Sequence, residues 1–200
     1  ALQWFGACPS CGAAGTLSET VTERKSSSTG RIPTVALADL QPRELERIPT
    51  GLEELDRALG GGLVPGQVAL LGGDPGIGKS TLLLQALSNL SIPALYVTGE
   101  ESADQIAMRA RRLGLEAKGM QLLAETQLER VLGALEGARP AVAVVDSIQT
   151  LWSEALQSAP GSVAQVRECA AQLTRHAKRA GTALFMIGHV TKEGAIAGPR

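Results

Sequence analysis

The segment at residues 73–80 reads GDPGIGKS and fits the pattern GxxxxGK[ST], directly after an apolar segment and at the start of an aliphatic one. Its glycines let backbone N–H groups approach phosphate oxygens, and the amino end of the following helix adds its positive dipole. The alternative is a glycine-rich turn that contains Lys-Ser by chance. The apolar segments on both sides, which the motif requires, disfavour that alternative. The segment predicts a site for ATP or ADP with Mg²⁺. The predicted nucleotide-binding residues of this loop are Gly73, Asp74, Pro75, Gly76, Ile77, Gly78, Lys79, Ser80 and Thr81.

Three of these residues have separate predicted tasks. Lys79 is expected to bridge the β- and γ-phosphate oxygens as a mobile charge and so to take part in catalysis. Ser80 is expected to bind Mg²⁺ through its hydroxyl, and Thr81 to lie at the α- and β-phosphates. A second metal-binding residue is predicted at Asp146, because an apolar strand that ends in a carboxylate suits the shell of the Mg²⁺ ion. The alternative for Asp146 is a helix cap.

Two adjacent carboxylates, Glu100 and Glu101, follow another apolar strand. Ligands of parallel sheets bind beyond the carboxyl ends of the strands, and a carboxylate there can accept a proton from the water that attacks the γ-phosphate. Glu100 is the first choice for this catalytic base and Glu101 the second, because adjacent residues at a strand end point in different directions. The alternative is that both acids only begin the next helix, where the helix dipole favours them.

Other polar side chains have weaker signals. His189 also ends an apolar strand and is predicted to hydrogen-bond the γ-phosphate and to report its loss to the following loop; a purely structural histidine is the alternative. His176 lies among charged residues of a helix and is expected on a solvated face. Arg109 and Arg112 are candidates for contacts with the nucleotide base or a neighbouring subunit, and surface charge is an equal alternative.

These residues require a scaffold in which strands and helices alternate. We expect strands over 67–71, 94–98, 121–124, 141–145 and 183–187. We expect helices over 53–59, 79–90, 103–113, 128–135 and 163–180. Thr50 and Glu53 have the spacing of a capping box for the first helix, and Ser102 can cap the third. The fold class is therefore α/β, a RecA-like P-loop ATPase fold with a doubly wound, mostly parallel sheet and right-handed crossovers.

Composition supports this architecture and narrows the choice of partners. The chain has 200 residues, of which 44% are hydrophobic and only 2% aromatic, so the core must be built from aliphatic side chains. The net charge of −1 gives no overall attraction for nucleic acid, so any DNA binding must come from local basic loops. With neither a long apolar run nor a signal peptide visible, we expect a cytoplasmic protein without a membrane partner.

The chain divides into three expected parts. Residues 1–19 form a knuckle around Cys8 and Cys11, residues 20–47 form a polar linker, and residues 48–200 form the ATPase domain. The third cysteine, Cys169, is expected in the core. A structural zinc site needs four ligands, so this single CxxC pair is half of a site, and we expect Zn²⁺ to be absent or weakly held.

These motifs, in this order, resemble the RadA (Sms) family of bacterial DNA-repair proteins, within the RecA/DnaB-like P-loop ATPase superfamily. The resemblance covers nearly the whole chain. Besides the phosphate loop, it is carried by residues 4–12, 50–56, 59–66, 96–102, 145–150 and 188–199. The last of these segments is the most specific, since the phosphate loop alone is shared by hundreds of families.

The resemblance implies an ATPase that single-stranded DNA stimulates and that promotes branch migration of recombination intermediates. It further implies a homo-hexameric ring, single-stranded and branched DNA as partners, and a functional link to the RecA recombinase. DNA would contact the loops at 149–162 and from Thr191 onward. Lys192 and Arg200 are the implied phosphate contacts, and Trp152 is implied to stack on a base or to pack at a subunit interface.

The family also has features that this sequence does not show. Its amino-terminal zinc finger has two CxxC pairs, of which only the second is present, and its carboxyl domain would follow Arg200. We therefore expect a chain truncated at its carboxyl end. The alternative function is a KaiC-like ATPase and autokinase in signalling, which the paired Glu100 and Glu101 allow but the knuckle and the loop after His189 disfavour.

Overall fold

The structure is a computed structural model, and it describes residues 35–39 and 46–189. The chain forms two compact units, residues 1–43 and 44–200. In the first unit, the described part contains one 3₁₀ turn, Leu37–Asp39. The second unit contains the sheet and helices that carry the predicted site residues.

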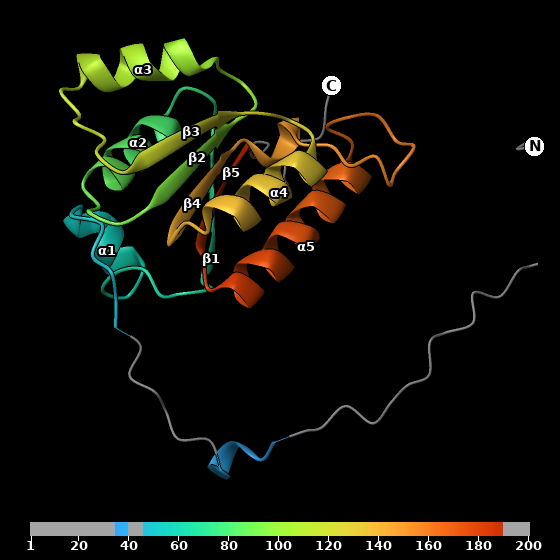
Figure 1. Cartoon of the computed structure of the whole chain (residues 1–200), viewed down its shortest axis with the longest axis horizontal. Coiled ribbons are helices and arrows are strands. Elements are labelled where there is room, and N and C mark those ends of the chain that lie inside the picture. The colour runs from blue at the N-terminus through green and yellow to red at the C-terminus, as the bar shows by residue number, and fades with distance from the viewer. Residues whose placement is uncertain (1–34, 40–45, 190–200) are drawn as a thin grey trace, which may run out of the picture. The chain divides into compact units, whose positions relative to one another are not determined.

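A sheet of five parallel strands, in the order β1-β5-β4-β2-β3, runs through the second unit (Figure 1). The strands are β1 (Val68–Gly73), β2 (Ala94–Thr98), β3 (Met120–Ala124), β4 (Val142–Asp146) and β5 (Ala183–His189). Gly73 lies opposite His189, and Thr98 lies opposite Asp146. The carboxyl ends of β1, β5, β4 and β2 therefore meet at one edge, as the predicted site requires.

Helices cover both faces of this sheet. They are α1 (Glu53–Ala58), α2 (Lys79–Ser88), α3 (Ala103–Arg112), α4 (Leu128–Ala138) and α5 (Val163–Ala180). One buried cluster joins α4 and α5 to the sheet, and a second cluster on the opposite face joins α2 and α3 to it (Figure 1). This arrangement confirms the predicted doubly wound α/β fold.

Alternation along the strands explains why two separate cores form. In β2, Leu95 and Val97 pack in the cluster with α4 and α5, whereas Ala94 and Tyr96 pack in the other. Because β2 and β4 are buried on both faces, they are made almost wholly of apolar residues. Cys169 of α5 lies in the core with a free thiol, as predicted.

The predicted capping box of α1 is wrong. Thr50 is fully buried, and both its backbone N–H and its hydroxyl donate to Oδ1 of Asp56 at 2.8 Å. Leu52 is the residue at the N-cap, and its side chain makes no capping bond. The cap of α3 is as predicted, because Oγ of Ser102 accepts from the backbone of Gln105 and the Gln105 side chain accepts in return.

The expected solvated face for His176 is also wrong. Its side chain is only 5% exposed. Cys169, Leu173 and Ala177 lie on the buried side of α5, and His176 is at helical spacing from Cys169 and Leu173. The charged neighbours that suggested solvent exposure, Arg175 and Lys178, are themselves exposed. Within the described residues, no helix is long and apolar enough to cross a membrane.

Candidate nucleotide site

The phosphate loop connects the end of β1 to the start of α2. β1 extends to Gly73, two residues beyond the predicted strand, and α2 begins at Lys79 as predicted. Gly76 and Gly78 have φ values of 81° and 101°, in the left-handed region that favours glycine. A Cβ at either position would meet no atom within 4 Å, so backbone conformation and not lack of space requires glycine there.

Lys79 lies inside this loop. Its side chain is buried, and Nζ donates to the carbonyl oxygens of Gly73 at 2.8 Å and Asp74 at 2.7 Å. Its ammonium group therefore stands where the end of β1 meets the amino end of α2. An anion at that helix end would meet the Lys79 charge and the unpaired N–H groups of the first turn together. By contrast, Ile77 is exposed at the outside of the loop.

Asp146 is buried at the end of β4 and has a partner that the sequence did not suggest. The hydroxyl of Tyr96 in β2 donates to Oδ2 of Asp146 at 2.5 Å. Burial raises the pKa of the Tyr96 phenol far above its ordinary value, the Asp146 carboxylate raises it further, and the nearby Ser80 hydroxyl opposes the shift. The two predicted Mg²⁺ ligands, Ser80 and Asp146, are thus both next to one buried phenol.

Glu100 lies between the ends of two other strands. Its Oε1 is 2.6 Å from Oγ of Ser147 and 2.9 Å from Nε2 of His189. Burial alone would raise the pKa of Glu100, but the hydrogen bonds from Ser147 and His189, and the charges of His189 and Lys79, hold it below its ordinary value. The structure therefore places three predicted site residues together: Lys79, Glu100 and His189.

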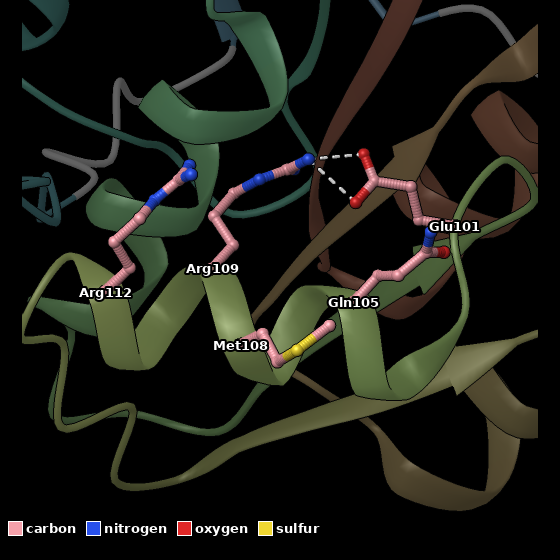
Figure 2. Close-up of a pocket in the computed structure, with 5 residues that line it drawn as sticks. All are labelled: Glu101, Gln105, Met108, Arg109 and Arg112. Carbon is pink, nitrogen blue, oxygen red and sulfur yellow. Dashed lines mark hydrogen bonds and ion pairs between the residues drawn. The ribbon is translucent and has the colours of Figure 1, made fainter.

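Glu101 points to a different place. Nη2 of Arg109 donates to both of its carboxylate oxygens, at 2.5 and 2.7 Å (Figure 2). With Gln105, Met108 and Arg112 from α3, this ion pair lines a cavity of about 520 Å³. Figure 2 shows Arg109 directed at Glu101, while Arg112 lies further along the helix without joining the pair. The Glu101 side chain is thus fixed by an ion pair with a residue of α3, the helix that follows it. Arg109 therefore has a specific partner within the chain.

Residues near the site include several that sequence reasoning missed. Tyr96 and Ser147 are two of them, although a lone phenol in an apolar strand and a hydroxyl directly after Asp146 were both visible signals. Gly99 is another, because a Cβ there would lie 2.0 Å from Oγ1 of Thr150. Gln149 donates through Nε2 to the His189 carbonyl at 3.1 Å and so links β5 to the loop after β4.

Of the predicted DNA-contact and zinc residues, Trp152 is the one among the residues that the structure describes. Trp152 is half-buried against the start of α4: its backbone N–H donates to Thr126 O at 3.0 Å, and its carbonyl accepts from Leu128 N at 2.8 Å. The remaining four, Cys8, Cys11, Lys192 and Arg200, lie outside the described residues. Across residues 35–39 and 46–189, no group of three His, Cys, Asp or Glu side chains could hold a metal ion.

Comparison with known proteins assigns the family. Residues 34–195 match the family described as AAA domain. The chain belongs to this AAA domain family. Such domains use a nucleotide with Mg²⁺, and the oxygen donors of Ser80 and Asp146 are of the kind that Mg²⁺ prefers. The glycine loop with Lys79 suits the phosphates of the nucleotide.

Several bacterial relatives of this AAA domain protein are named DNA repair protein RadA. The chain is 56% identical over 207 residues to the one from Pseudomonas aeruginosa, 48% over 212 residues to that of Escherichia coli, and 46% over 210 residues to that of Bacillus subtilis. Each alignment covers 99% of this chain and 46% of the relative. The chain thus spans about half the length of these relatives, and the predicted resemblance to RadA is confirmed.

Proposed function

We propose that this chain is the ATP-hydrolysing motor of a DNA-repair protein that is stimulated by single-stranded DNA and promotes branch migration. The observation that carries the proposal is the contact of Glu100 with both Ser147 and His189. It joins a carboxylate with a lowered pKa to the ends of β4 and β5, next to the phosphate loop. The RadA name of the relatives supports the DNA-repair role.

The catalytic part of the proposal assigns one task to each residue. Glu100, ionised, accepts a proton from the water that attacks the γ-phosphate. An ionised carboxylate can only accept hydrogen bonds, so Ser147 Oγ and His189 Nε2 both donate to it and orient it. Lys79 neutralises phosphate charge, and Ser80 and Asp146 hold Mg²⁺, which supplies further charge neutralisation when bound.

The coupling part of the proposal starts at His189. His189 contacts Glu100 through its ring, and its carbonyl accepts from Gln149, the first residue of the 149–162 loop. When the γ-phosphate is lost, the surroundings of the Glu100 and His189 side chains change. A resulting movement of His189 is transmitted to that loop through its hydrogen bond with Gln149. The segment from residue 190 onward follows His189 directly in the chain, so a movement of His189 also affects that segment.

The larger assembly follows from the resemblance to RadA. We propose a cytoplasmic homo-hexamer that acts with the RecA recombinase on single-stranded and branched DNA. Within it, residues 48–200 form the motor, residues 20–47 the linker and residues 1–19 half of a zinc knuckle with Cys8 and Cys11. Lys192 and Arg200 contact DNA phosphates. Trp152, anchored by Thr126 and Leu128, offers its ring to DNA or to a neighbouring subunit.

The test is ATP turnover by the full-length hexameric protein with and without single-stranded DNA, at one fixed salt concentration. We expect single-stranded DNA to raise turnover, and a Lys192→Ala variant to keep the basal rate but to respond less to DNA. If turnover is the same with and without DNA, the motor assignment fails and the KaiC-like alternative is favoured. Self-phosphorylation of the protein in the same assay would support that alternative directly.

A further inference from the structure

Tyr96 is the only tyrosine of the chain and lies in β2, a strand whose residues are all buried. Its side chain is fully buried in β2, within a cluster of aliphatic residues and Phe185. A phenylalanine would fill the same space without a polar atom to satisfy. A hydroxyl in such surroundings is unfavourable unless it has a partner, so the partner indicates what the hydroxyl does.

That partner is the carboxylate predicted to hold the metal. The phenol donates to Oδ2 of Asp146 at 2.5 Å, across the adjacent strands β2 and β4. Ser80, the other predicted Mg²⁺ ligand, lies beside the same phenol in the first turn of α2. One hydroxyl from a buried strand therefore donates to one predicted ligand and lies near the other.

We propose that Tyr96 is a positioning residue for the Mg²⁺ of the bound nucleotide. By donating to Oδ2, its hydroxyl fixes the rotation of the Asp146 carboxylate and leaves Oδ1 as the oxygen free of the phenol. Groups that orient metal ligands in this way typically change metal affinity by about 10–100-fold when they are removed. The inference rests on the proposed ATPase function.

The direct test is Tyr96→Phe, which removes one oxygen and keeps the ring. We expect the Mg²⁺ concentration for half-maximal ATP turnover to rise about 10-fold or more, with turnover largely restored at saturating Mg²⁺. Binding of Mn²⁺ in the presence of ADP, measured by electron paramagnetic resonance, should weaken by a similar factor. ADP binding in EDTA should not change, because the phenol contacts no phosphate-loop backbone.

The matched control is Thr182→Val, which removes another buried hydroxyl from the same sheet. Oγ1 of Thr182 donates to the Pro140 carbonyl at 2.9 Å, next to the amino ends of β4 and β5 and away from Asp146. We expect this variant to lose some stability but to keep the wild-type Mg²⁺ dependence. The proposal is overturned if Tyr96→Phe also keeps the wild-type Mg²⁺ dependence of turnover. It is overturned as well if both variants change this dependence equally.

A spectroscopic readout uses the single tyrosine. Protein labelled with ¹³C at the phenol carbon of tyrosine gives one signal from this chain, which we expect to shift when Mg²⁺ is added to the ADP complex. An unchanged signal would contradict the inference. Failure of the proposed function would look different: wild-type protein would then show no hydrolysis dependent on Lys79, whatever the effect of Tyr96→Phe.

Discussion

Glu100 and Glu101 are adjacent in the sequence, but they lie in different surroundings. Glu100 contacts Ser147 and His189 at the edge where four strands end, and its pKa is lowered. Both carboxylate oxygens of Glu101 accept from Nη2 of Arg109. A carboxylate whose two oxygens both accept from one guanidinium nitrogen has little freedom to reach a water molecule. At the scale of single residues, the geometry therefore favours Glu100 as the base.

Glu100→Gln should bind ATP and lose turnover, because the amide keeps the shape of the side chain but cannot accept a proton. We expect the rate of ATP hydrolysis to fall by about 10²–10⁴-fold, while binding of a fluorescent ATP analogue persists. Glu101→Gln is the matched control and should retain most of the turnover. The assignment would be reversed if Glu101→Gln abolished hydrolysis and Glu100→Gln left it intact.

Sequence reasoning could rank Glu100 above Glu101 because strand ends point adjacent side chains in different directions. It could not find the task of Tyr96, because the partner of its hydroxyl is Asp146, 50 residues away in the chain. Thr50 was predicted wrongly for a different reason. Its hydroxyl could cap a helix locally, but the nearby Asp56 side chain accepts its hydrogen bond instead.

At the scale of elements, strands and helices follow from local patterns, while their ends depend on neighbours. The strand β2 and the helix α5 begin and end at the predicted residues. The strands β1 and β5 run two residues further than predicted, because Gly72 and Gly73 pair with Gly188 and His189. A single sequence does not show which strands pair, so these extensions were not foreseen.

The helix α5 carries a buried histidine whose titration affects stability. Burial, with the charge of Arg179, lowers the pKa of His176, although Glu136 acts in the opposite direction. Both ring nitrogens lack a hydrogen-bond partner among the described residues. Since the unfolded chain takes up a proton on this ring more readily than the folded one, stability falls as pH falls below about 6.5.

His176→Leu should therefore reduce the acid sensitivity of the fold. The free energy of unfolding, from denaturant titrations at pH 7.5 and 5.5, should fall less between these two values in the variant than in the wild type. The apolar side chain also removes two unpaired polar atoms from the core. An identical loss in both proteins would show that another group, such as Glu136, controls this pH range.

At the scale of the whole molecule, the strand order explains why the site forms. The β1-β5-β4-β2 neighbours bring the phosphate loop, His189, Asp146 and Glu100 to one edge, although these residues span more than half of the described chain. The order of motifs along the sequence was enough to predict this edge.

The central claim is that residues 73–80 and Glu100 form one site for ATP hydrolysis. The most direct measurement compares the ATP turnover of wild-type protein with that of Lys79→Ala, at saturating Mg²⁺ and equal protein concentration. Removing the Lys79 charge from the loop should abolish turnover, while the sheet and its helices persist because two apolar clusters hold them together. Unchanged turnover in Lys79→Ala would contradict the account.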